Sequence, residues 1–167
     1  MNDSQEALPR YGGAMRRTAA VAGTGAVMIG VAAAALTYPW GSTDVPLPDA
    51  TAEPVEVVTS YVAALDAHDC DTAVALAAPS FADTARDWCR NVAGLNNVEI
   101  GAPLDEDPGW SGLSADTEVV SVTVDFDLDW RPLRADGSLP EGPTTWGYRL
   151  TRASVDEPWR IVDNGVG

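Results

Sequence analysis

The residue types that most often perform catalysis are sparse in this sequence. Its one histidine, His68, lies among Asp66, Asp69 and Asp71, and a carboxylate beside an imidazole is the arrangement of a general base. The same position at the end of a predicted helix is also typical of a solvated histidine stabilised by the helix dipole. The sequence contains neither a Gly-x-Ser-x-Gly nucleophile elbow nor a phosphate-binding loop. We therefore predict no catalytic residue and no cofactor.

Three aspartates alternate along one predicted strand, namely Asp125, Asp127 and Asp129. Alternate residues of a strand lie on the same face, about 7 Å apart. Calcium takes roughly six to eight oxygen ligands that converge from flexible loops, and a flat row of carboxylates does not converge. We therefore predict no metal site but a solvated face, neutralised in part by Arg149 and Arg160.

The sequence contains two cysteines, Cys70 and Cys89. Outside the cytoplasm a lone pair of cysteines most often forms a disulfide, and this one would stabilise the fold by about 3 kcal/mol in the chain-entropy model. The alternatives are a redox pair or a metal-binding pair. Cys70 and Cys89 do not have the Cys-x-x-Cys spacing that either alternative would require, and the sequence offers no second histidine as a metal ligand. We therefore predict a disulfide.

The charge balance excludes one class of partner. The 25 acidic residues and ten arginines give a net charge of −15. A nucleic-acid-binding protein needs a basic surface, so we expect no nucleic-acid partner. The charge is also uneven, because residues 1–39 carry +1 and residues 40–167 carry −16. Such asymmetry indicates that the two segments lie in different environments.

An uncharged apolar run over residues 18–38 separates these two segments. About 20 apolar residues suffice to span a bilayer. Arg16 and Arg17 precede the run, so the positive-inside rule places the N-terminus in the cytoplasm and the acidic part outside. Two alternatives stay open. Ala33 and Ala35 offer a small-x-small site for signal cleavage and secretion, and the run could instead be a buried core helix.

The chain is thus expected to have four parts and to use the membrane as one partner, through its N-terminal helix. We expect a cytoplasmic N-terminus over 1–17, a transmembrane helix or uncleaved signal anchor over 18–38, a Pro-rich linker over 39–53, and an extracytoplasmic domain over 54–167.

The sequence of residues 54–167 predicts helices first and strands afterwards. Apolar residues recur at helical spacing and then, over 120–130, in strict alternation. The expected helices span 54–67, 71–78 and 80–91, with Asp71 as a helix N-cap; the expected strands span 98–103, 120–130, 146–150 and 159–161.

Helices followed by a meander of half-apolar strands predict an α+β domain, with helices on one face of an antiparallel sheet. A long turn centred near Gly137 would place Phe126 opposite Tyr148 and Asp125 opposite Arg149.

Three segments carry a resemblance to a known family: residues 55–68, the stretch HDCDTAVALAAPSF, and the closing EPWRIVDNGVG. Together with the order of the elements, they resemble the NTF2-like (SnoaL-like) superfamily in its membrane-anchored actinobacterial form. The resemblance implies an N-terminal transmembrane helix followed by an NTF2-like cone of three helices packed on a curved antiparallel sheet.

The resemblance also implies a cavity inside the cone. Tyr61, on the first helix, could reach the interior as a donor residue does in the isomerase branch, and Phe126, Trp146 and Tyr148 are further candidates for the cavity wall. The strand face that points inward carries no acid to serve as the partner of Tyr61. Trp110 lies in a Pro/Gly-rich loop, where an exposed tryptophan is a candidate contact for a partner.

We therefore expect a membrane-anchored, extracytoplasmic domain that acts as a non-catalytic binding or assembly module, with a homodimer or a protein partner through the sheet. Two alternatives are an enzyme of the ketosteroid-isomerase type and a carrier of a small apolar ligand. The polarity of the interior discriminates among them. Converging ionisable groups favour catalysis, whereas a filled interior favours binding or assembly.

Overall fold

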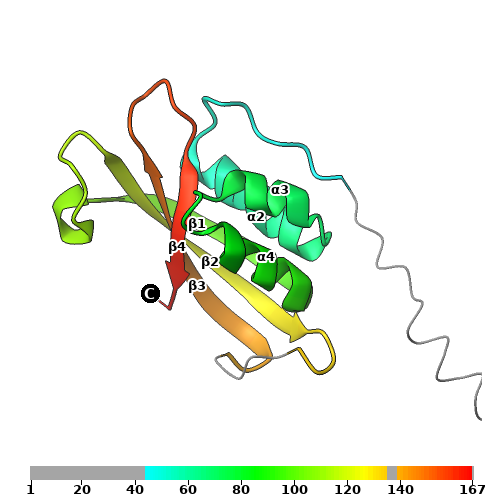
Figure 1. The fold of residues 1–167 in the computed structure, drawn as a ribbon. Coiled ribbons are helices and arrows are strands. Elements are labelled where there is room, and N and C mark those ends of the chain that lie inside the picture. Colours follow the sequence, from blue (N-terminus) through cyan, green and yellow to red (C-terminus); the bar gives the residue numbers. More distant parts are fainter. Residues whose placement is uncertain (1–43, 135–138, 167) are drawn as a thin grey trace, which may run out of the picture. The chain divides into compact units, whose positions relative to one another are not determined.

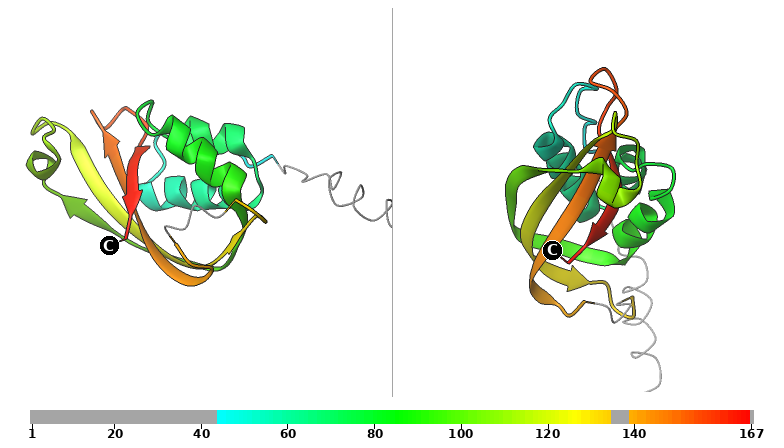
Figure 2. Two further views of the ribbon diagram at one scale, coloured as in Figure 1. Left: turned by 60° about the horizontal axis from the view of Figure 1, so that its bottom comes forward. Right: turned by 90° about the vertical axis from the view of Figure 1, so that its left-hand side faces the viewer.

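The computed structural model describes residues 44–134 and 139–166, which fold into helices packed against one face of an antiparallel sheet (Figure 1). The sheet has the strand order β1-β2-β3-β4 and curves around the helices (Figure 2). The elements in chain order are α2 (Pro54–Asp66), α3 (Cys70–Leu76), α4 (Ala82–Asn91), β1 (Val92–Glu106), the 3-10 turn η1 (Pro108–Ser111), β2 (Glu118–Trp130), β3 (Gly142–Arg152) and β4 (Arg160–Gly165).

This arrangement corrects the expected fold class, which was a transmembrane helix followed by an NTF2-like cone. The described residues form three helices and one four-stranded antiparallel sheet. None of the helices in this part of the chain is long and apolar enough to cross a membrane. The membrane-spanning helix expected over 18–38 lies outside the described residues.

Helix α2 begins where the sequence predicts, because local signals agree there. Pro54 occupies the first turn, where its missing N–H is not needed. The Glu53 N–H donates to the Glu56 side chain at 3.1 Å, which pairs one of the free donors of the first turn. The buried face of the helix lies against the sheet and comprises Val57, Val58, Tyr61, Val62, Ala64 and Leu65.

Helix α3 is capped by Asp69, so the prediction of Asp71 as its N-cap is wrong. Helix α2 ends in the turn at His68, which has a left-handed φ of 59°, and the chain re-enters a helix directly afterwards. The Asp69 side chain accepts the Thr72 N–H at 3.1 Å and the Val45 N–H at 2.9 Å. These bonds, led by the one from Val45, lower the pKa of Asp69. Asp69 therefore caps α3 and also fastens the segment that precedes α2.

The predicted disulfide is present. Cys70, at the start of α3, is bonded to Cys89, near the end of α4, with a Cα–Cα distance of 5.5 Å. Cys89 is fully buried. The bond therefore ties the two short helices together inside the core.

Strand β1 is much longer than the predicted strand over 98–103. It runs for 15 residues, and its pairing with β2 shifts register at three points, between Val92 and Gly94, Asn96 and Glu99, and Ile100 and Pro103. Asn97, at the second shift, has a left-handed φ of 52°. Residues whose types indicated a turn in the sequence thus form bulges within the strand.

Strand β2 alternates as predicted, with its even-numbered residues from Val120 to Trp130 buried against the helices. Its register with β3 differs from the predicted one. Phe126 lies opposite Thr144 rather than Tyr148, and Asp125 lies opposite Thr145 rather than Arg149. The prediction assigned the β2 side chains to the correct faces of the sheet, but their partners on β3 are displaced by four residues. The last pair of this register is Leu128 with Gly142, and Gly137, near which the turn was expected to be centred, lies outside the described residues.

Candidate functional site

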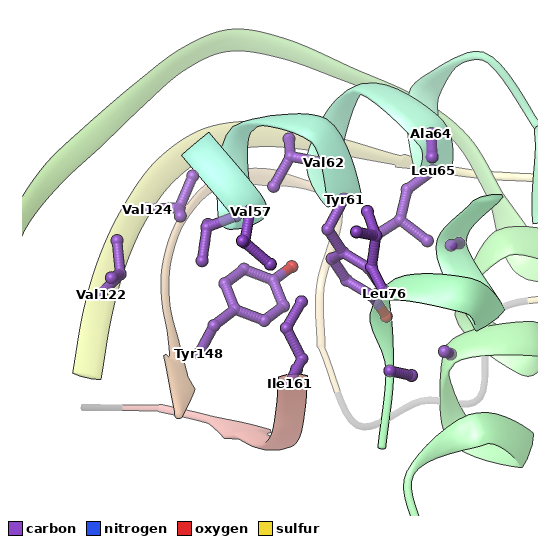
Figure 3. Close-up of a cluster of buried hydrophobic side chains, with 14 of the residues drawn as sticks. Val57, Tyr61, Val62, Ala64, Leu65, Leu76, Val122, Val124, Tyr148 and Ile161 are labelled. Atoms are coloured by element: carbon purple, nitrogen blue, oxygen red, sulfur yellow. The ribbon is translucent and has the colours of Figure 1, made fainter. Parts of the chain in front are cut away.

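Tyr61 and Tyr148 meet in the middle of the core (Figure 3). Their ring centroids are 5.4 Å apart at an interplanar angle of 69°, an edge-to-face contact that aromatic pairs favour. Both residues are fully buried, and neither hydroxyl has a hydrogen-bond partner. Burial raises the pKa of both phenols well above the ordinary value, so both remain protonated at neutral pH.

The other two cavity candidates also belong to the packed core. Phe126 is buried, and Trp146 packs partly buried against the core cluster. Trp146 and Trp130 lie 5.5 Å and 5.6 Å from the central Trp88, measured between ring centroids. In the amide orientation that satisfies both indoles, Asn164 accepts the Trp88 and Trp146 N–H groups at 3.3 Å and 3.1 Å. The side chains expected to line a cavity therefore fill the space between helices and sheet.

His68 lies partly buried at the α2–α3 turn, and its Nδ1 is 3.2 Å from the Leu65 carbonyl oxygen. Burial, followed by the charge of Arg131, lowers its pKa. The neighbouring carboxylates have structural roles, since Asp66 accepts the Leu95 N–H at 2.8 Å and Asp69 caps α3. The arrangement at His68 is that of a packed turn.

Trp110 is 82% exposed on η1. The turn that presents it is well defined, because the Asp107 side chain accepts the Gly109 N–H at 2.8 Å and Gly112 ends the turn with a left-handed φ of 68°. The expectation that Trp110 contacts a partner stays a prediction.

A groove on the sheet face opposite the helices is the feature that sequence reasoning missed. We call it the outer groove. It has a volume of about 340 Å³ and crosses all four strands. Gly147 and Gly165 are partners in the β3–β4 register. Because neither has a side chain, the surface of the sheet is depressed at this pair. Its lining includes Leu104, Glu106, Ser121, Thr123, Gly147, Arg149, Asp163, Gly165 and Val166.

Arg149 organises the charges in the outer groove. Its Nε lies 2.8 Å from Glu106 Oε2, and its Nη1 lies 3.3 Å from Asp163 Oδ2. Ser121 donates its hydroxyl to Glu106. The Glu106 side chain is only 15% exposed, whereas that of Asp163 is 61% exposed. Glu106 therefore positions Arg149, and Asp163 presents its carboxylate to solvent.

The row of aspartates on β2 is not neutralised as predicted. Arg149 pairs with Glu106 and Asp163 instead, and Arg160 donates to the Ala75 carbonyl. Neutral donors reach the row: Thr145 donates to Asp125, Asn97 to Asp127 at 2.6 Å, and Asn96 to Asp129 at 3.0 Å. The negative charge of this face is therefore retained. The part of the chain that the structure describes has no cluster of three or more candidate metal ligands.

One sequence signal could have located part of the outer groove. The alternation in 120–130 and 146–150 places Ser121, Thr123 and Arg149 on the outer face. The depression itself depends on the pairing of Gly147 with Gly165, which lie far apart in sequence. Only the register brings them together.

No family model matches this chain, and no curated protein matches it. Among solved structures, the chain is similar to a SEC-C motif-containing protein from Rhodopseudomonas palustris, with 15% sequence identity and a TM-score of 0.45. The match covers 71% of this chain and 82% of that one. The expected membership of the NTF2-like superfamily is corrected, because no family model matches the chain. That expectation rested on diffuse segments and on an order of elements that unrelated α+β domains can share.

Proposed function

We propose that this chain is a membrane-anchored, extracytoplasmic domain with a non-catalytic binding function. The observation that carries the proposal is the filled interior between the helices and the sheet. Tyr61 and Tyr148 pack there against aliphatic side chains. Asp69 is the buried charged residue of the described chain, and its carboxylate is bonded to the backbone as a helix cap. An interior without converging acids and bases supports binding rather than turnover.

The charge distribution and the disulfide support the location. The −16 segment follows an apolar run preceded by two arginines, as the positive-inside rule requires of an exported domain. The Cys70–Cys89 disulfide is of the kind that persists in oxidising compartments.

Cysteine labelling in intact cells tests the location. Ser154→Cys places a thiol in the exposed turn between β3 and β4, and the matched variant Ser4→Cys places one in the N-terminal segment. A membrane-impermeant maleimide is expected to label the Ser154→Cys variant and to leave the Ser4→Cys variant unlabelled until the cells are lysed. Labelling of both variants only after lysis would contradict an extracytoplasmic domain.

Carriage of a small apolar ligand is a second candidate function, favoured by the two buried hydroxyls without partners. A ligand with a polar group would pair with them, but only if the side chains packed between the helices and the sheet moved apart to admit it. Native mass spectrometry of the full-length chain in mild detergent separates the two functions. The binding domain is expected to give the mass of the disulfide-bonded chain alone, whereas a carrier would retain a small molecule that Tyr148→Phe releases.

A further inference from the structure

We propose that the outer groove binds an extended segment of a partner protein that carries arginine or lysine. This inference rests on the proposed binding function and names the surface and the chemistry of the partner.

The floor of the groove is open backbone. A Cβ added at Gly165 would meet nothing within 4 Å, and one added at Gly147 would meet only the Gly165 carbonyl oxygen, at 3.4 Å. The groove crosses four strands, and three inter-strand spacings amount to about 14 Å. An extended peptide covers that distance with about four or five residues. The size therefore suits a short linear segment.

The rims of the groove supply apolar contacts. Leu104 is 68% exposed and Val166 is 74% exposed, and they come from the two edge strands or their ends. Large apolar side chains at both ends of a polar groove favour a segment that carries aliphatic residues as well as charged ones.

The charge of the groove favours a partner segment of positive charge. Asp163 offers an exposed carboxylate held by Arg149 and by the N–H of Asn164, at 2.9 Å. The carboxylates of Glu106 and Asp163 outnumber the Arg149 guanidinium between them. Beyond Thr123 on the same face, Asp125 lies opposite Glu99, so the net charge of this face is negative. Guanidinium and ammonium groups are attracted to such a face. A second copy of this chain, with −16 over residues 40–167, and an anionic membrane surface are both repelled.

Fluorescence anisotropy with the full-length chain in nonionic detergent tests the proposal. The probe is a fluorescein-labelled peptide of about six residues, alternating arginine and valine, and the matched probe replaces arginine with glutamate. The arginine probe is expected to bind and the glutamate probe is not. Gly165→Val fills the floor and is expected to weaken binding at least about tenfold, equivalent to about 1.4 kcal/mol.

Asp163→Asn removes charge without adding volume and is expected to weaken binding about fivefold. Asp156→Asn, in the exposed β3–β4 turn, makes the same change in net charge away from the groove and is expected to leave affinity within about twofold. The disulfide and the thermal transition show whether Gly165→Val folds. If it does not fold, the affinities of Asp163→Asn and Asp156→Asn for the arginine probe are compared instead.

Three outcomes would overturn the inference: no binding of the arginine probe, equal weakening by Asp163→Asn and Asp156→Asn, or self-association of the wild-type chain that Gly165→Val abolishes. The first two would leave the location experiment with Ser154→Cys unaffected. Failure of the groove assignment is therefore distinguishable from failure of the proposed function.

Discussion

Replacing Tyr148 with phenylalanine should stabilise this protein. The substitution removes a hydroxyl that is fully buried without a hydrogen-bond partner and keeps the ring that contacts Tyr61 edge to face. Leaving a buried polar group unpaired costs about 1–3 kcal/mol. We therefore expect Tyr148→Phe to raise the free energy of unfolding by about 1–2 kcal/mol, which is about 4–8 °C in Tm for a domain of this size.

Guanidinium denaturation followed by tryptophan fluorescence measures this change. The midpoint should rise while the m value stays constant, because the surface exposed on unfolding hardly changes. Tyr148→Ala is the contrasting variant. It also removes the ring and should destabilise the fold by about 3–5 kcal/mol. The opposite signs of the two variants separate the hydroxyl from the ring.

A double-mutant cycle with Tyr61→Phe completes the test. Because neither hydroxyl has a partner, the two substitutions should add to within about 0.5 kcal/mol. A Tyr148→Phe variant that is less stable than the wild-type protein would contradict this prediction, because the hydroxyl must then have a partner in the folded state. Coupling of more than about 1 kcal/mol would show that the two hydroxyls bond to each other.

Three further predictions follow from the same interior. Burial raises the pKa values of Tyr61 and Tyr148, so these groups make the free energy of unfolding independent of pH below about pH 10 and lower it as the pH rises further, by up to about 1.4 kcal/mol per pH unit for each tyrosine. The Tyr61→Phe/Tyr148→Phe double variant should show a flatter profile by denaturation between pH 9 and 11. Replacing Cys70 and Cys89 together with alanine should lower the free energy of unfolding by about 3 kcal/mol, and an unchanged denaturation midpoint would contradict that role. Asp69→Ala should destabilise the fold by about 1–2 kcal/mol and speed amide exchange at the start of α3, whereas Asp71→Ala, the matched control, should have the smaller effect on both.

Local signals located the helices to within a few residues. Pro54 and the apolar spacing after it depend only on neighbours in sequence, and α2 begins where they indicate. The disulfide was likewise predictable, because two cysteines allow one pairing. The N-cap of α3 was misplaced by two residues, since the left-handed turn at His68 leaves Asp69 as the last residue before the helix.

Features that depend on pairing between distant residues could not be predicted in the same way. The 15 residues of β1 include three register shifts, and their residues look like turn signals when read alone. The β2–β3 connection is long, so its length does not constrain the register as a tight hairpin does. An error of four residues placed Arg149 opposite Asp125 rather than Ser121. The outer groove was missed for the same reason, because its floor is a cross-strand pair of glycines.

The bonds by which Asp69 and Thr72 hold Val45 also bear on how the domain would respond to tension from its N-terminal side. Tension applied to the chain at residue 44 reaches Val45, whose N–H and carbonyl are held by Asp69 and Thr72. That clamp adjoins Cys70, and the disulfide transmits the load covalently to α4. Helix α2 lies outside this path while the clamp holds, so pulling from the N-terminal side loads the α3–α4 pair before it can peel α2 from the sheet.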